Sequence, residues 1–175
     1  MGWYYTYNSS MRDQIAEITQ NQDYPDGNKL TCLARKLNGM TLWTVWERTM
    51  PDKPPYRFIG CYLIRKGDEG SWGYKPLDEY MGPAEYSCPL SYLDMAPLMP
   101  EHDSHGWSAK WREGVKNWHA VHNAKWAIGQ KLLLWNGKDV YYVQRLKPFR
   151  VNTSPDFNGY EYRAKKSQFT AIQEG

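Results

Sequence analysis

Three Asn-Gly pairs separate alternating runs of apolar and polar residues. Asn38-Gly39 separates KLTCLARKL from MTLWTVWER, Asn136-Gly137 separates KLLLW from KDVYYVQRL, and Asn158-Gly159 lies between FRVN and YEYRAKKSQFTAI. An Asn-Gly pair between apolar runs is the strongest local signal of a two-residue β-hairpin turn, because both residues tolerate positive φ. The pattern therefore predicts three hairpins.

A further strand is predicted over RFIGCYLIRK, which ends at the turn GDEG. The next residues, SWGYK, can return antiparallel to it, so residues 29 to 75 are expected to form one antiparallel sheet. Trp3, Tyr4 and Tyr5 near the N-terminus also have the composition of a strand.

Two helices are expected. Ser10 can cap a first helix that ends near residues 20 to 22, with an apolar face of Met11, Ile15 and Ile18. The second helix is predicted from Ser108 to about Trp126. Its apolar stripe consists of Trp111, Val115, Trp118 and His122.

The strands cluster and do not alternate with helices, which favours an α+β fold over a doubly wound one. We expect an antiparallel sheet with one or two packed helices and a strand-rich C-terminal segment that could form a small barrel. Residues 1–124 would form the α+β core, with residues 125–175 packed on it as part of one domain. The second range holds nine Lys or Arg and four Asp or Glu, whereas the first holds thirteen and fifteen.

Composition narrows the class of protein. The 175 residues include nine Trp and fourteen Tyr, enough large side chains for a core. No apolar run approaches the ~18 residues that a spanning helix needs, and no leader sequence begins the chain, so a cytoplasmic protein is expected. Cys32, Cys61 and Cys88 include no CxxC pair and are expected to be reduced.

The segment WGYKPLDEYMGPAEYSCP, residues 72 to 89, has two interpretations. As an active site it would use Cys88 as a nucleophile, with His102 or His105 as the base and nearby carboxylates. As a structural clamp, its Gly and Pro residues would make turns while its aromatic side chains pack inward. The clamp requires fewer assumptions, and we favour it.

Several short motifs resemble those of a family of uncharacterised proteins carried by bacteriophages, prophages and plasmids. The resemblance spans the chain and implies an accessory protein of a mobile element, but no particular reaction. One departure is Pro76-Leu77, where the family pattern has a Met before the acids. The matching motifs are Met1-Gly2-Trp3, Gly73-Tyr74-Lys75, Asp78-Glu79, Met81-Gly82-Pro83, Cys88-Pro89, Leu93-Asp94 and Trp111-Arg112-Glu113.

All four histidines occur as two His-x2-His pairs, at residues 102 and 105 and at residues 119 and 122. On a helix, His119 and His122 would share a face, and Glu101 or Asp103 could add an oxygen ligand. Structural zinc sites usually recruit cysteine, and His119 can instead extend the aromatic stripe. We therefore expect no metal and no cofactor.

The C-terminal range combines cations that could neutralise phosphates with aromatic rings that could stack on unpaired bases. The alternative is that strand alternation sends the rings inward and the charges to water. The cations are Lys131, Lys138, Arg145, Lys147, Arg150, Arg163, Lys165 and Lys166. The aromatic residues are Trp135, Tyr141, Tyr142, Phe149, Tyr160 and Tyr162.

The favoured function is therefore binding to a host macromolecule in a bacterial cytoplasm, with a host or phage protein such as a defence nuclease as the partner. The alternatives are a nucleic-acid-binding accessory protein and a small Cys/His enzyme; we expect no catalytic residues and no membrane partner. The candidate binding residues are Trp43, Trp46, Trp72, Tyr74, Lys75, Asp78, Glu79, Lys147, Arg150 and Arg163.

Overall fold

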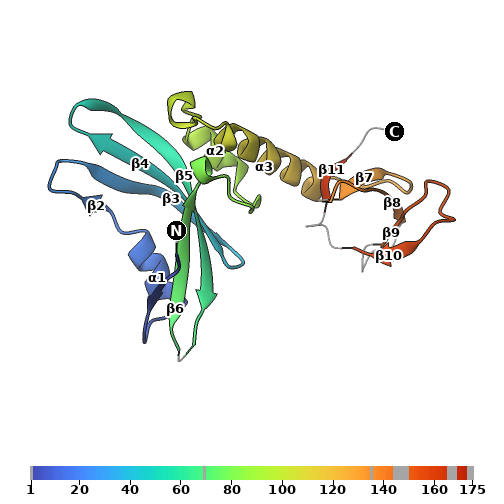
Figure 1. The fold of residues 1–175 in the computed structure, drawn as a ribbon, viewed down its shortest axis with the longest axis horizontal. Coiled ribbons are helices and arrows are strands. Elements are labelled where there is room, and N and C mark those ends of the chain that lie inside the picture. The colour runs from blue at the N-terminus through green and yellow to red at the C-terminus, as the bar shows by residue number, and fades with distance from the viewer. Residues whose placement is uncertain (1, 69, 135, 144–149, 165–168, 173–175) are drawn as a thin grey trace. The chain divides into compact units, whose positions relative to one another are not determined.

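The computed structural model describes residues 2–68, 70–134, 136–143, 150–164 and 169–172. The chain divides into an N-terminal unit, Met1–Arg112, and a C-terminal unit, Glu113–Gly175. Each unit contains its own antiparallel sheet, so the α+β class predicted from the sequence is confirmed (Figure 1).

The N-terminal unit is built on a six-stranded, strongly curved sheet in the order β1-β6-β5-β4-β3-β2 (Figure 1). Every neighbouring pair in this sheet is antiparallel, and β4 and β5 lie at its centre. The strands are β1 (Tyr4–Thr6), β2 (Gln22–Asp23), β3 (Lys29–Asn38), β4 (Thr41–Met50), β5 (Lys53–Lys66) and β6 (Trp72–Asp78).

The hairpin between β3 and β4 is confirmed, with its turn shifted by one residue. Asn38 pairs with Thr41, so the turn consists of Gly39 and Met40 and not of Asn38-Gly39. Gly39 has φ of 61°, a left-handed conformation that a residue without Cβ adopts readily. The predicted return of SWGYK onto the preceding strand is also confirmed, as β6 pairs with β5.

Helix α1 (Met11–Ile18) covers one face of this sheet. Ser10 accepts a hydrogen bond from the Asp13 N–H, and the Asp13 carboxylate accepts one from the Ser10 N–H, so a capping box fixes the start of the helix. Ile18 packs with Leu42 and Ile64, two apolar side chains from the strands. The short helix therefore gains its stability from packing on the sheet.

The other face of the sheet is covered by α2 (Leu90–Met95) and by the first turns of α3 (Trp107–Asn123). The Trp43 ring on β4 lies 5.7 Å from the Trp111 ring on α3, centroid to centroid. Two 3-10 turns, η1 (Glu79–Met81) and η2 (Pro100–His102), lead into these helices. The sequence pattern predicted α3 but not α2 or either turn.

The C-terminal unit contains a sheet in the order β10-β9-β8-β7-β11. Leu132, Val140, Val151 and Phe169 form its buried core. The described pairings do not join β10 to β11, so they do not close a barrel. The strands are β7 (Lys131–Leu134), β8 (Asp139–Val143), β9 (Arg150–Asn152), β10 (Glu161–Arg163) and β11 (Phe169–Ile172).

Two predicted hairpins fall in this unit. The one around Asn136-Gly137 is confirmed as a hairpin, since β7 pairs with β8 and Gly137 has φ of 78°, but the Leu134 N–H donates to the Lys138 carbonyl, so the loop is longer than the predicted two residues. The pairing of β9 with β10 is also present, but Asn158-Gly159 is not a two-residue turn. The buried amide of Asn152 donates to the carbonyls of Phe157 and Gly159, which organises a longer loop.

Among the helices of the described residues, none combines the length and apolar character that crossing a membrane requires.

Candidate functional site

Residues 72 to 89 consist of strand β6 and the turns that follow it. Strand β6 ends at Asp78, whose carboxylate accepts hydrogen bonds from the N–H groups of Tyr80 (3.0 Å) and Met81 (3.2 Å). Burial raises the pKa of Asp78, and these two hydrogen bonds oppose that rise. Gly82 then ends η1 with φ of 58°, a left-handed conformation that reverses the chain. Asp78 thus caps a turn.

Glu79 is fully buried and all its oxygens are used. Its Oε1 accepts from the Ile59 N–H on β5 at 3.0 Å. Its Oε2 accepts from the Ser108 hydroxyl at 2.6 Å and from the Arg112 Nε–H at 2.5 Å, both on α3. A buried carboxylate with a cation and two further donors is stable as a charged group, and here it joins the sheet to α3.

Arg112 extends this connection to a third element. Its two terminal nitrogens donate to the carbonyls of Leu93 (3.3 Å) and Ala96 (2.5 Å), at the end of α2. The planar guanidinium therefore satisfies carbonyls that the helix end leaves without partners. Asp78, Glu79 and Arg112 act together as a structural clamp.

Cys88 does not have the surroundings of a nucleophile. Its side chain is fully buried, and burial raises its pKa, so the thiol stays protonated. The rings of the two proposed bases pack on other aromatic side chains: His102 lies 4.5 Å from Tyr56 and His105 lies 4.9 Å from Trp107. A thiolate reaction at Cys88 therefore gains no support from this geometry.

The histidines are likewise placed for packing. His122 stacks on Trp118 at 3.8 Å, and its Nδ1 lies 2.7 Å from the Trp118 carbonyl oxygen. His119 contacts the same indole edge to face. Among the described residues, no group of three or more His, Cys, Asp and Glu side chains is arranged to hold a metal ion.

Trp43 and Trp46 were proposed as binding residues on the assumption that their rings are exposed, and that assumption is wrong. They are 0% and 1% exposed, respectively. The reason is that β4 is a central strand of a sheet covered on both faces, so successive side chains are buried on opposite sides. The Trp43 indole donates to the Ser87 hydroxyl at 3.3 Å.

The other candidates in the N-terminal unit are dispersed. Trp72 and Tyr74 are partly buried and pack against the cluster under α1, and Lys75 is partly buried on the same strand. Glu79 is withdrawn from solvent into the clamp. These residues therefore do not form one exposed binding surface.

The basic candidates in the C-terminal unit are partly neutralised. Arg150 donates to Glu161 at 2.8 Å, and Lys131 lies 2.8 Å from Asp139. Arg163 is exposed, whereas Lys147 lies outside the described residues. Beside Arg163, the Tyr160 ring is 74% exposed and stacks on Tyr162 at 6.0 Å.

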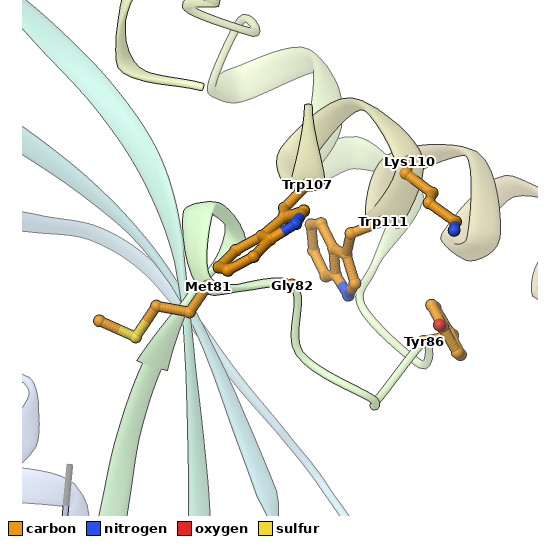
Figure 2. Close-up of a pocket in the computed structure, with 6 residues that line it drawn as sticks. All are labelled: Met81, Gly82, Tyr86, Trp107, Lys110 and Trp111. Carbon is orange, nitrogen blue, oxygen red and sulfur yellow. The ribbon is translucent and has the colours of Figure 1, made fainter. Parts of the chain in front are cut away.

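A more coherent site lies on the surface beside the clamp (Figure 2). It is a hollow of about 370 Å³, here called the aromatic hollow, and its rings come from two segments far apart in sequence. Trp107 is 50% exposed at its edge, and Met81 and Tyr86 are also exposed. The lining residues are Met81, Gly82, Tyr86, Trp107, Lys110 and Trp111.

Local structure explains how these side chains meet. Asp103 caps α3 by accepting from the N–H groups of Ser108 (3.1 Å) and Ala109 (3.0 Å), which places Trp107 in the first turn. Trp111, one turn later, is buried, and its indole donates to the Glu85 carbonyl at 2.8 Å. That bond holds the loop after Gly82 against the helix.

Sequence reasoning missed Tyr86, Trp107 and Lys110. Trp107 lies one residue before the helix start expected at Ser108, so the expected helix does not include it. A signal was present, because Asp103 precedes Trp107 and Asp is a favoured capping residue. The meeting of Tyr86 with α3 is a tertiary contact that spacing alone does not reveal.

Comparisons of this chain with protein-family models, with curated proteins and with solved structures find no match.

We expect Arg112→Met to lower the free energy of unfolding by about 3–5 kcal/mol, because it leaves the Glu79 carboxylate buried without its cation. The measurement is urea unfolding followed by tryptophan fluorescence. The matched control is Arg57→Met, which removes the partly exposed Arg57–Glu47 pair (2.9 Å) and should change stability by less than about 1 kcal/mol.

Restoring charge balance should recover part of the loss, so Glu79→Gln combined with Arg112→Met should be more stable than Arg112→Met alone. Equal stability of Arg112→Met and Arg57→Met would show that the clamp does not hold the N-terminal unit together.

We expect Cys61 and Cys88 to resist an aromatic disulfide reagent at pH 8 in the folded protein. Burial raises the pKa of Cys61 to about 12, and a raised pKa lowers the fraction of reactive thiolate, here to about 10⁻⁴ at pH 8. Cys32 is less buried and should react slowly. All three thiols should react after denaturation; fast labelling that Cys88→Ser removes would revive the enzyme hypothesis.

Proposed function

We propose that this chain is an accessory protein of a mobile element that acts by binding a host protein through the aromatic hollow. The observation that carries the proposal is the half-exposed Trp107 at the edge of a concave surface, with Met81 and Tyr86 exposed beside it. Apolar and aromatic side chains gathered in one exposed hollow are typical of protein-interaction sites.

The base of the hollow is suited to act as a pre-formed pocket. Trp111 is held by its bond to the Glu85 carbonyl, and Arg112, the next residue, is held by Glu79. A partner side chain entering the hollow would therefore meet ordered walls, which lowers the entropy lost on binding. Tryptophan and tyrosine in such pockets commonly supply much of the binding energy.

Lys110 indicates the chemistry of the partner. It lines the hollow and forms no ion pair with the residues that the structure describes. A matching partner surface would present an apolar side chain to Trp107 and an acidic group to Lys110. The partner that we propose is a host protein, such as a defence nuclease, with these two groups on its contact surface.

A second candidate is nucleic-acid binding by the C-terminal unit. It is favoured by the exposed Tyr160 ring, which stacks on the partly buried Tyr162, and by the nearby exposed Arg163. The Tyr160 ring could stack on an unpaired base while Arg163 contacts phosphate. The pairing of Arg150 with Glu161 and of Lys131 with Asp139 leaves fewer cations for this role than the sequence suggested.

We expect Trp107→Ala to weaken partner binding by about 2–4 kcal/mol, because truncation removes the main apolar contact. Immobilised protein is incubated with a bacterial lysate, and a protein retained by the wild type but not by the variant is purified for affinity measurement. Tyr7→Ala is the matched control, since Tyr7 is an exposed aromatic residue that does not line the hollow.

Retention of the same proteins, with equal affinity, by wild type, Trp107→Ala and Tyr7→Ala would contradict the assignment of the hollow. Circular dichroism should show both variants folded, as both side chains are largely outside the core.

The nucleic-acid candidate predicts binding of single-stranded DNA or RNA that weakens steeply with salt. Replacing the exposed cations, as in Lys138→Glu with Arg163→Glu, should weaken binding to all sequences alike, and Tyr160→Ala should remove the stacking contribution of about 1–3 kcal/mol. Fluorescence anisotropy with labelled oligonucleotides measures both effects. Micromolar binding at physiological salt that Trp107→Ala leaves intact would favour this candidate over the first.

A further inference from the structure

A second hollow, of about 580 Å³, opens in the N-terminal unit on the side of the sheet that α1 covers. Helix α1 and all six strands of the sheet contribute to its lining. It shares no residue with the aromatic hollow, and it is called the sheet pocket below. Its volume lies within the range of small-molecule sites.

Four tyrosine rings, of Tyr4, Tyr24, Tyr62 and Tyr74, line the sheet pocket. Tyr4 and Tyr74 are stacked with centroids 5.6 Å apart, whereas Tyr62 meets Tyr74 at 6.1 Å with the ring planes 60° apart. The walls therefore lie in different directions. Tyr4 and Tyr24 are 54% and 43% exposed, so solvent reaches their rings. The face of an aromatic ring carries partial negative charge and attracts a cation.

A carboxylate without a cation lies beside these rings. Glu17 lines the pocket, is exposed, and takes part in none of the ion pairs of the described residues. Its Oε1 accepts from the Tyr74 hydroxyl at 3.4 Å and its Oε2 from the Thr6 hydroxyl at 3.5 Å, which holds it at the edge of the aromatic wall. Burial and the nearby Glu17 charge both raise the pKa of Tyr74, so this phenol is neutral at physiological pH.

The charge of the sheet pocket selects a positive ligand. Among the described residues that line it, none is Lys or Arg, so the Glu17 carboxylate sets the sign of the local charge. An anion would be repelled by this carboxylate, and so would a cation that carries an anionic group close to its positive charge.

Hydrogen bonding selects among the possible cations. A primary ammonium has three N–H donors and a guanidinium has five, and each donor needs an acceptor when it leaves water. Acceptors of the sheet pocket are already in use, because both Glu17 oxygens accept from hydroxyls and the Gln22 Oε1 accepts from the Tyr24 hydroxyl. A quaternary ammonium has no N–H group, and aromatic cages are its usual recognition site.

We propose that the sheet pocket binds a small quaternary ammonium cation of the choline class. The trimethylammonium group lies against the tyrosine rings, and Glu17 supplies the opposite charge. Betaine and phosphocholine carry the same group, but their own carboxylate or phosphate would face Glu17, so free choline is the favoured source. This assignment does not depend on the function of the aromatic hollow.

The experiment titrates the full chain with choline up to millimolar concentration, by calorimetry and by saturation-transfer NMR of the N-methyl protons. Choline should bind at least about tenfold more tightly than its neutral carbon isostere, in which a tert-butyl group replaces the trimethylammonium group. It should also bind more tightly than betaine and phosphocholine, which add an anion, and than ethanolamine, which replaces the methyl groups with N–H donors.

Glu17→Gln removes the charge and keeps an acceptor for the Tyr74 hydroxyl, so it should weaken choline binding by at least about fivefold. Glu101→Gln is the matched control, because Glu101 is an exposed acid that does not line the sheet pocket, and this variant should bind as the wild type does.

Tyr4→Leu combined with Tyr24→Leu removes the two exposed rings and should weaken binding by at least about fivefold. Tyr4→Phe combined with Tyr24→Phe keeps the ring faces and should bind within about twofold of the wild type. Circular dichroism checks that each variant is folded. Absence of choline binding, equal binding of the neutral isostere, tighter binding of betaine, phosphocholine or ethanolamine than of choline, or unchanged binding by Glu17→Gln would each overturn the proposal.

Discussion

The buried pair of Glu79 and Arg112 is the interaction on which the N-terminal unit depends. Through one carboxylate and one guanidinium it joins β5, α2 and α3, which are separated by long stretches of chain. Two charges in an apolar interior are stable only when all their hydrogen-bonding groups are satisfied in one geometry. The pair therefore restricts the positions that α2 and α3 can take on the sheet, and this restriction is separate from its contribution to the free energy of unfolding.

This restriction also explains why the aromatic hollow is where it is. The turn that ends at Gly82 follows Glu79 directly, and Trp107 and Trp111 flank the Ser108 and Arg112 partners on α3. The clamp therefore brings two aromatic segments together as a by-product of satisfying one buried carboxylate. A catalytic interpretation of Asp78 and Glu79 would assign a reaction to carboxylates whose hydrogen bonds hold the walls of the aromatic hollow in place.

Much of the fold was predictable because it rests on local signals. Hairpin turns at Gly39 and Gly137, the Ser10 cap and the period of α3 each depend on neighbouring residues. The burial of Trp43 and Trp46 was not predictable, because it requires knowing that helices cover both faces of β4. The partners of Glu79 were hidden for the same reason: Ile59 and Arg112 are brought to it only by the tertiary fold.

Both faces of β4 are interior surfaces, and each carries a buried tryptophan whose indole has a polar neighbour. Trp43, on the clamp side, has its indole N–H satisfied by Ser87, as close packing of an interior demands. Trp46, three residues later on the opposite side, is equally buried, and its indole opposes the rise that burial causes in the pKa of the neighbouring Tyr62 phenol. Both indoles are therefore explained by burial between the sheet and the elements that cover it, and neither ring is exposed to a partner.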